Sequence, residues 1–446
     1  MAKLRAFLTF QKVPLVFLSI LCLALALRVV VFLVAAPHPE RFMLDDSSGY
    51  LTLAQNLEAS YWNSNPEFLT LTLQRPPVYP LFLAAWGRIG ALPWSAILGQ
   101  ILFDEGVLIL TFLLLSPLVG TWPALTALII LAIDLAVVQQ SNLLLSETLF
   151  TFLVVASALG LWRGLRSGRF AFSAAGGLLL GLGVLTRPIG LYLPFVLLPA
   201  SWYLGRHLNR RRHLGVLMVF ALSFVLIAGA WVGRNYALTG VPIVSTIEGT
   251  DLLYHRAASA LADSQGLDFV RNPEVRRVMW AQLNAEVLAR HSPEANPAQR
   301  SQAESALGLQ ILLDHPIGTL KTALRGLVLQ VLPHVRSRGI SPLFTQLGLP
   351  TPWVGDTLTE YTVTGFYSLF LFLICISAIY GAYRLAYQRW PSFLFLVGLL
   401  GYFAIISAGP AADVRFRVPY MPYLAALAGY GLTRLWPQQS REFRED

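Results

Sequence analysis

The chain has 446 residues, of which 55% are hydrophobic and only 13% are charged, and its formal net charge is +9. Soluble domains carry roughly a quarter charged residues, so this composition excludes a soluble globular protein. Only two cysteines, Cys22 and Cys375, are present, and both lie in apolar segments, which excludes a disulfide framework and a cysteine-based metal site.

Apolar runs long enough to cross a bilayer recur along the chain and predict an all-α polytopic membrane protein. They cover residues 13–36, 95–118, 122–138, 144–162, 170–186, 189–205, 214–235, 361–383, 391–409 and 418–436. The first run lacks a cleavage site, so we expect an uncleaved helix and not a signal peptide. The apolar segment 78–92 contains Gly87-Arg88 and ends before Pro93, which favours an interfacial or re-entrant segment.

The basic residues predict the topology. They are concentrated in short segments near residues 3–12, 163–169, 206–212 and 384–389, and with ten spans all four segments fall on one side, which the positive-inside rule makes cytoplasmic. Both termini share that side. This distribution explains the net charge without nucleic-acid binding, and it predicts a multi-pass protein of the inner (plasma) membrane.

Two long segments, residues 37–77 and 236–360, are predicted to face the outside. The second of them separates two membrane-spanning parts, so the chain has three parts. Residues 1–235 form an N-terminal transmembrane catalytic module that includes the extracytoplasmic loop 37–77, and residues 361–446 form C-terminal transmembrane helices. Between them, residues 236–360 form an extracytoplasmic segment, for which the pattern predicts helices over 268–290, 298–313 and 317–332. The last of these is expected to lie at the membrane interface.

The segment Leu44–Tyr50 places two adjacent carboxylates, Asp45 and Asp46, just after the first span. A carboxylate near a membrane is costly unless it is hydrated, paired or used, so this pair is a candidate site. The alternative is a solvated turn that caps the following helix, because Asp and Ser are good N-caps.

Further polar residues lie where the outer ends of spans are expected. The cations suit a phosphate, which guanidinium groups bind bidentately, and they are Arg75, Arg187, Arg234, Arg415 and Arg417. The carboxylates Asp45, Asp46 and Glu147 are suited to deprotonate the hydroxyl or amine group of an acceptor molecule. Carboxylates and arginines at one membrane surface therefore indicate transfer from a lipid-phosphate donor.

Each of these residues also has a structural explanation. An arginine near a span end often extends to the interface, Thr186-Arg187-Pro188 could be a tight turn, and Glu147 could be a helix cap. Asp413 could form a local ion pair with Arg415 or Arg417. The histidines lack the spacing of metal ligands, and they include His255, His291, His315 and His334.

Several motifs together resemble GT-C fold glycosyltransferases, in the branch that contains protein O-mannosyltransferases and the lipid A aminoarabinose transferase. Asp46-Ser47-Ser48-Gly49-Tyr50 followed by Ala54 resembles the acidic signature of their first loop. The other matching segments are Arg75-Pro76-Pro77-Val78-Tyr79-Pro80, Leu145–Phe150, Leu185–Pro188, Trp231–Asn235 and Arg415–Pro422. The order and spacing of these motifs extend the resemblance over about residues 20–430.

This resemblance implies a bundle of about ten to twelve transmembrane helices with extracytoplasmic interfacial helices. It implies an enzyme, a hexosyl- or pentosyltransferase, that moves a sugar from a polyprenyl-phosphate donor to an acceptor outside the cytoplasm and inverts the anomeric centre. The acceptor (lipid, glycan or protein) is left open. No divalent metal is expected to be required, and Ser47 stands where relatives often have Glu.

The resemblance also assigns roles to single residues. Asp46 is the expected general base, with Asp45 and Glu147 as supporting acids. The expected ligands of the donor phosphate are Arg75, Arg415 and Arg417, followed by Arg187 and Arg234, and the motifs add Tyr50 and Tyr79 to the site.

Two other classes of protein have many spans. A transporter or flippase of lipids or lipid-linked sugars often shows two related halves and charges near mid-membrane, whereas here the halves differ and the polar residues gather at one predicted surface. A non-catalytic scaffold of the cell envelope would explain the spans but not the site residues. The sequence favours the glycosyltransferase.

Overall fold

The structure is a computed structural model, and it describes residues 2–62, 65–290, 295–331, 340–349, 357–410 and 412–435. Helices make up 85% of the model, and no strand occurs among these residues. The all-α class predicted from the apolar runs is therefore confirmed.

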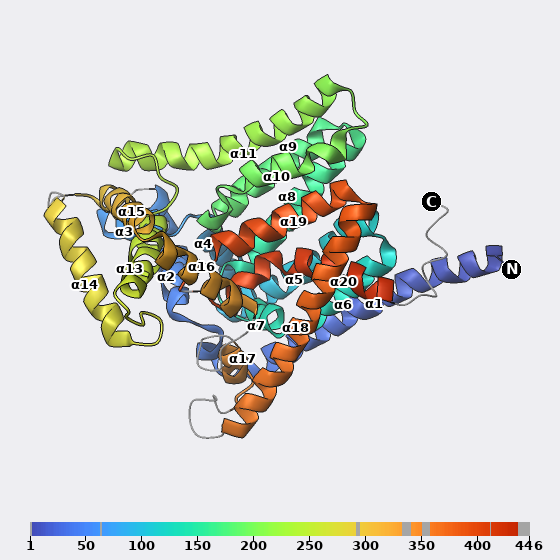
Figure 1. Cartoon of the computed structure of the whole chain (residues 1–446), viewed down its shortest axis with the longest axis horizontal. Helices are drawn as coiled ribbons and strands as arrows, with labels where there is room; N and C mark the ends of the chain where they lie inside the picture. The colour runs from blue at the N-terminus through green and yellow to red at the C-terminus, as the bar shows by residue number, and fades with distance from the viewer. Residues whose placement is uncertain are drawn as a thin grey trace.

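Long apolar helices form a bundle that accounts for the predicted spans (Figure 1). Within the described ranges, six segments are long and apolar enough to cross a membrane: α1 (Ala2–Ala35) over Val13–Ala35, α5 (Trp94–Val119), α8 (Glu147–Ser167), Pro188–Gly205, α11 (Arg210–Thr239) and α18 (Thr357–Gln388) over Thr362–Gln388. Pro188–Gly205 consists of η3 (Pro188–Gly190), α10 (Leu193–Ser201) and η4 (Trp202–Gly205). The shorter α9 (Phe170–Val184), α19 (Trp390–Ile406) and α20 (Met421–Leu435) complete the predicted runs. The expected number of ten to twelve crossings stays a prediction.

The sequence pattern predicts a single segment over residues 122–138, but the structure has two helices there. α6 (Thr121–Ile133) and α7 (Leu135–Ser141) meet at an angle of 63°. Asp134 lies at the break in an extended conformation, and its side chain accepts a hydrogen bond of 3.1 Å from the Val137 N–H. Because an Asp cap starts a new helix, the chain changes direction here, and this bend brings residues 139–143 to the acidic first loop.

The first loop folds into short helices against the bundle. After η1 (Pro39–Phe42), it contains α2 (Asp45–Gln55), the turn η2 (Glu58–Trp62) and α3 (Pro66–Gln74). Asn65 caps α3 by accepting a bond of 3.0 Å from the Glu67 N–H. α4 (Val78–Ile89) follows, and its 12 residues are too few to cross a bilayer. This length agrees with the predicted interfacial or re-entrant segment.

Beyond one end of the bundle lies a second helical group, while the N-terminal end of α1 extends beyond the other end (Figure 1). The group contains α12 (Ile247–Thr250), η5 (Asp251–Ala257), α13 (Ala258–Ser264), α14 (Pro273–Arg290), α15 (Pro297–Asp314) and α16 (Pro316–Val331). Three of these, α14, α15 and α16, match the helices predicted between residues 268 and 332. The short α17 (Ser341–Gln346) is not part of this group and packs against α1, η1 and α7. The group has its own apolar core, which includes Leu253, Met279, Leu283 and Leu307.

α16 has the amphipathic character expected of an interfacial helix. Ile317, Leu320, Leu324 and Val328 are all more than half exposed, and their spacing places them on one face. Along one edge of this face Lys321 pairs with Asp263 at 3.1 Å, and Arg325 pairs with Asp268 at 3.6 Å. These pairs explain why two cations can lie in an otherwise apolar helix.

Close helix packing fixes the segment that leads into α20. η6 (Val414–Tyr420) precedes α20, which packs against α18. A Cβ atom on Gly381 would lie 1.9 Å from the Leu427 carbonyl oxygen, and one on Gly431 would lie 2.1 Å from that of Ser377. Only glycine permits this approach, as in other membrane helix pairs, and it holds the end of η6 in place.

Candidate active site

Ser47, and not an acidic residue, caps the start of α2. The Ser47 hydroxyl accepts a bond of 3.0 Å from the Leu44 N–H and donates one of 3.0 Å to the Leu144 carbonyl oxygen. It is completely buried. Asp45 and Asp46 therefore occupy the first turn without serving as the cap, and the helix dipole favours their negative charge there. The capping explanation of this motif applies to Ser47, so the carboxylates require another explanation.

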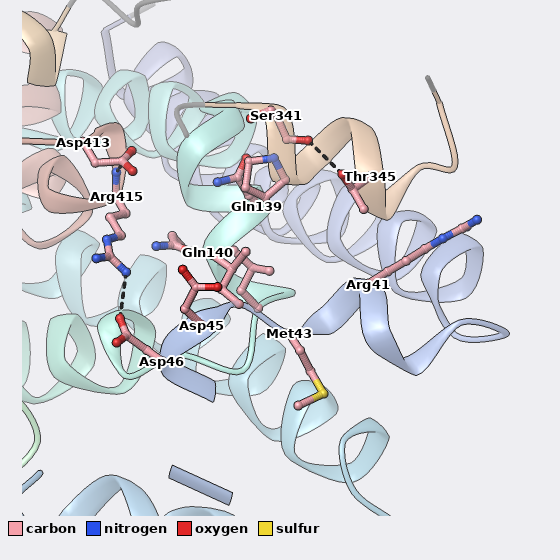
Figure 2. Close-up of a pocket in the computed structure, with 13 residues that line it drawn as sticks. Arg41, Met43, Asp45, Asp46, Gln139, Gln140, Ser341, Thr345, Asp413 and Arg415 are labelled. Atoms are coloured by element: carbon pink, nitrogen blue, oxygen red, sulfur yellow. Dashed lines mark hydrogen bonds and ion pairs between the residues drawn. The ribbon is translucent and has the colours of Figure 1, made fainter. Parts of the chain in front are cut away.

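The Asp46 carboxylate lies between two arginines from distant parts of the chain. Arg75 Nη2 is 3.2 Å from Oδ1, and Arg415 Nη1 is 3.2 Å from Oδ2, as Figure 2 shows for Arg415. The Asp46 side chain is 42% exposed, whereas Arg75 is 11% and Arg415 is 22% exposed. The fold thus joins residues that are 29 and 369 positions from Asp46.

These contacts set the charge of the site. Burial alone would raise the pKa of Asp46, but the positive charges of Arg415 and Arg75 and their hydrogen bonds lower it more, so the pKa lies below the usual value of 3.8. For Arg415, burial opposes the charge, but Glu147, Asp413 and Asp46 favour it more, which raises the pKa above its usual value. Asp46 is therefore a charged carboxylate and a weak base in this state.

A second carboxylate, Glu147, begins α8 and pairs with Arg187. The Arg187 Nη1 atom is 2.6 Å from Glu147 Oε1, and Glu147 is 1% exposed. Among the described residues neither carboxylate oxygen has a hydrogen bond of good geometry, although the distance defines an ion pair. Arg187 lies in the turn after α9, where its N–H bonds to the Gly183 carbonyl oxygen. Arg187 can therefore lie in the expected tight turn and also take part in the candidate site.

Tyr50 and Ser146 connect the two ion pairs. The Arg75 guanidinium lies over the Tyr50 ring, 4.4 Å from its centroid. The Tyr50 hydroxyl and the Ser146 hydroxyl share a hydrogen bond of 3.2 Å, and Ser146 also accepts one of 3.3 Å from Arg187. One network therefore joins Asp46, the arginines on either side of it, and the Glu147–Arg187 pair.

The glycine of the acidic motif, Gly49, lies against the Arg75 side chain. A Cβ atom at this position would lie 2.7 Å from Arg75 Nε. Glycine therefore leaves the space along α2 in which the Arg75 side chain reaches Asp46. A larger residue here would displace that side chain.

A pocket of about 440 Å³, lined by polar and apolar side chains, opens beside Asp46 (Figure 2). Its walls come from the first loop, α7, α17 and the start of η6, and the lining residues are Arg41, Met43, Leu44, Asp45, Asp46, Gln139, Gln140, Leu143, Ser341, Pro342, Thr345, Asp413 and Arg415. Asp413 caps η6 by accepting a bond of 3.4 Å from the Arg415 N–H, while the Arg415 side chain turns toward Asp46. The volume lies within the range of roughly 300–1,000 Å³ that is usual for small-molecule sites.

Three of the residues proposed from the sequence have their polar partners outside this network, although the Tyr79 ring contacts the Tyr50 ring at a centroid distance of 4.7 Å. Arg417 is completely buried and pairs with Asp134 at 3.0 Å. Tyr79 is completely buried and donates a bond of 2.6 Å to Gln100 Oε1. Arg234 stacks on Trp231, 4.7 Å from the ring centroid, and bonds to Asn235.

The contribution of α7 and α17 to the pocket was not predicted from the sequence. Gln139 and Gln140 directly follow the apolar run 122–138, and two adjacent amides at the end of a predicted span are a signal, because polar groups in a membrane segment are costly and often functional. Nothing in the sequence pattern places Ser341 and Thr345 near Asp46. Within the described ranges, no group of three or more His, Cys, Asp or Glu side chains is arranged to hold a metal ion.

The comparisons with solved structures define the fold. The oligosaccharyltransferase AglB from Archaeoglobus fulgidus, in complex with an inhibitory peptide and a dolichol-phosphate, aligns with a TM-score of 0.55 at 14% identity, over 94% of this chain and 50% of that one. The apo form of the A. fulgidus oligosaccharyltransferase aligns with a TM-score of 0.53 at 14% identity, over 92% and 50%. This chain spans about half the length of those proteins.

ArnT from Cupriavidus metallidurans bound to undecaprenyl phosphate aligns with a TM-score of 0.40 at 14% identity, over 93% of this chain and 77% of that one. No curated protein sequence is significantly similar to the chain.

The helical bundle and these alignments define a multi-pass membrane protein with the GT-C fold of membrane glycosyltransferases. Residues 74–231 match the family described as dolichyl-phosphate-mannose-protein mannosyltransferase, a segment that includes Arg75, Glu147 and Arg187. The resemblance predicted from the sequence motifs is confirmed.

Proposed function

We propose that this protein is a glycosyltransferase that moves a sugar from a polyprenyl-phosphate donor to an acceptor on the extracytoplasmic side of the inner membrane. One observation carries the proposal: Asp46 lies half exposed between Arg75 and Arg415, at the edge of a pocket. The family description of residues 74–231, which names a dolichyl-phosphate-mannose donor, supports this class of donor.

The donor phosphate would bind Arg75 and Arg415. Each guanidinium uses one terminal nitrogen for Asp46, and the Nε atom of each is buried without a hydrogen-bond partner among the described residues. Both arginines therefore keep donor capacity, and phosphate oxygens are strong acceptors for such groups. Arg187 is a secondary candidate, because it lies in the same network through Ser146.

The remaining candidates have more distant roles. Arg417 is fully buried against Asp134, which favours a structural role. The hydrogen-bond partners of Arg234 and Tyr79 also lie outside the network, so we do not assign either a contact with the donor.

The reaction would be a direct displacement at the anomeric carbon. A nucleophilic oxygen or nitrogen of the acceptor attacks that carbon while the bond to the phosphate oxygen breaks, and inversion follows from attack on the opposite face. The bonding electron pair leaves with the phosphate, whose negative charge Arg75 and Arg415 stabilise. The acceptor proton moves to Asp46. The products are the glycosylated acceptor and the polyprenyl phosphate, and this step uses no divalent metal.

Donor binding would also activate the base. With both arginines on its carboxylate, Asp46 has a lowered pKa and is a poor proton acceptor. A phosphate that takes over the two guanidinium groups removes part of the attraction that lowers this pKa. Asp46 then becomes a stronger base when the donor is present, so proton removal is coupled to donor binding.

Glu147 would orient a substrate hydroxyl. Its oxygens are buried and have no aligned hydrogen bond within the described residues, and a carboxylate in that position can accept from a sugar or an acceptor. Asp45, on the pocket wall, is proposed as a supporting charge. The acceptor class (lipid, glycan or protein) is not part of the proposal.

The test uses purified full-length protein and a panel of polyprenyl-phosphate sugars that includes dolichyl-phosphate mannose. We expect at least one donor to raise the melting temperature and to be consumed with release of polyprenyl phosphate. In vesicles, movement of intact lipid-linked sugar across the bilayer without cleavage would contradict the proposal and favour a flippase. Absence of protection by every member of the panel would also contradict it.

A further inference from the structure

Gln140 is a buried amide whose side chain lacks a partner in the described part of the chain. It lies on α7, just after the bend at Asp134, and is 1% exposed. Neither its Nε2 nor its Oε1 has a hydrogen bond among the described residues. The side chain lines the pocket, and Figure 2 shows it beside Arg415 and the two acids.

The neighbouring amides differ from Gln140 in this respect. Gln139 Oε1 accepts a bond of 3.1 Å from the Leu343 N–H, and Gln346 Nε2 donates one of 2.9 Å to the Asn142 carbonyl oxygen. Gln100 donates a bond of 2.6 Å to the Leu143 carbonyl oxygen. Burying a polar group without a partner destabilises a protein. Because an apolar residue of the same size would avoid that cost, Gln140 indicates a ligand that supplies the missing partner.

The pocket chemistry indicates a hydroxylated ligand. An amide donates and accepts at once, which suits a hydroxyl group, and the pocket adds hydroxyls from Ser341 and Thr345. The pocket wall carries three carboxylates and only two arginines, so its charge disfavours an anionic ligand there. An apolar lipid chain would leave these groups without partners. A sugar ring satisfies all of these conditions.

The position of the pocket relates this ring to the donor. Arg415, which we assign to the donor phosphate, also lines the pocket. The glycosyl ring is bonded directly to that phosphate, so a ring in the pocket lies next to both Arg415 and Asp46. An acceptor glycan has the same hydroxyl chemistry but no such link to Arg415.

We propose that the pocket beside Asp46 holds the sugar ring of the donor and that Gln140 hydrogen-bonds one ring hydroxyl and thereby determines donor specificity. This inference rests on the proposed glycosyltransferase function. Gln140 is a specificity residue in this account, and it takes no proton from the substrate.

The experiment compares Gln140→Met, which keeps the length of the side chain but removes the amide, with wild type. The exposed Gln302 provides a matched control, Gln302→Leu. The probes are undecaprenyl phosphate without a sugar, and undecaprenyl-phosphate glucose, mannose and galactose, which differ in the configuration of single hydroxyls. Melting temperature is measured with each probe and without acceptor, and kcat/KM is measured with each sugar donor.

We expect Gln140→Met to melt at or above the wild-type temperature without ligand, because no side-chain hydrogen bond within the described residues is lost. Its protection by undecaprenyl phosphate should equal that of wild type, and the extra protection by the preferred sugar should disappear. The kcat/KM preference among the three donors should fall by about tenfold to a hundredfold, the range expected for one hydrogen bond to a buried group. Gln302→Leu should change none of these values.

Different failures have different meanings. If no polyprenyl phosphate protects wild type, the proposed function itself is contradicted. If wild type is protected and Gln140→Met keeps both the sugar-dependent protection and the donor preference, only the role of Gln140 is overturned. If the variant keeps the sugar-dependent protection but loses turnover with acceptor, the pocket belongs to the acceptor and the donor assignment is overturned. A second variant, Gln140→Glu, which keeps the accepting oxygen, serves if Gln140→Met does not fold.

Discussion

Two aspartate–arginine sites in this protein have the same chemistry but opposite environments. Asp134 and Arg417 are both completely buried, and the carboxylate also accepts hydrogen bonds from the Tyr367 hydroxyl and the Val137 N–H. Asp46 is 42% exposed and lies between two arginines at the mouth of a pocket. The first site is closed by protein groups, whereas the second is open to a ligand.

The contrast shows what separates a structural pair from a candidate catalytic one in a membrane protein. The Asp134 pair joins the bend of α7 to η6 and α18, and a third pair, Arg28 with Asp104, joins α1 to α5 in the same closed manner. Such pairs allow charges to lie inside a bundle. At Asp46 the carboxylate is 42% exposed and, with Arg415, lines a pocket, so a substrate can compete for the guanidinium groups.

Asp46→Asn is the change expected to have the largest effect on activity. Loss of the general base should lower the rate of sugar transfer by about 10²- to 10⁴-fold. Because a partly exposed ion pair contributes roughly 0–1 kcal/mol, the free energy of unfolding should change little. Transfer of radiolabelled sugar and thermal protection by the donor give the two quantities. Turnover close to wild type would eliminate Asp46 as the base.

The same substitution at the closed site, Asp134→Asn, should have the opposite result. It leaves the buried Arg417 charge uncompensated, and breaking a buried pair in this way costs about 3–5 kcal/mol of stability. Asn is also a good cap, so α7 should still begin at Leu135. We expect a lower melting temperature and yield but near wild-type turnover per folded molecule. A full loss of turnover in a stable variant would show that the two sites do not differ as argued.

Arg75→Ala should weaken donor binding without removing the base. The loss of one charge-assisted contact to phosphate corresponds to about a tenfold to hundredfold weaker affinity. Arg75→Lys should recover only part of this, because lysine cannot bind the phosphate bidentately. Titration with undecaprenyl phosphate measures the affinity, and Arg277→Ala, at an exposed pair with Glu274, is the control. An unchanged affinity in Arg75→Ala would count against the phosphate role.

The smallest expected effect is on the pH dependence of stability. The pKa of Asp46 is lowered in the folded protein, so its contribution to stability is present above its unfolded value of about 3.9 and is lost as pH falls through the lower folded pKa. The melting-temperature difference between wild type and Asp46→Asn should therefore shrink as pH decreases from about 5 to 3. A difference that grows over this interval would indicate a raised pKa instead.

The sequence predicted most of the fold because hydrophobic length constrains a membrane protein strongly. The helices at 273–290, 297–314 and 316–331 also agree with their patterns. The break at Asp134 was missed, because a cap inside an apolar run changes the direction of the helix without interrupting its hydropathy.

The candidate site was predicted in part. Motif order identified Asp46, Arg75 and Arg415, which the structure brings together. Arg415 and Arg417 could not be separated by sequence, since they lie two residues apart in one short helix. η6 directs one guanidinium to Asp46 and the other to Asp134, and such a difference depends on tertiary packing. For the same reason the pocket contribution of Gln140 and α17 could not be read from a linear pattern.

The most direct test of the open site is a structure of the full-length protein determined with undecaprenyl phosphate bound. We predict phosphate density between the Arg75 and Arg415 guanidinium groups, with at least one of the two Asp46 contacts broken and the Asp134–Arg417 pair unchanged. Phosphate bound elsewhere, with both 3.2 Å contacts of Asp46 intact, would contradict the account.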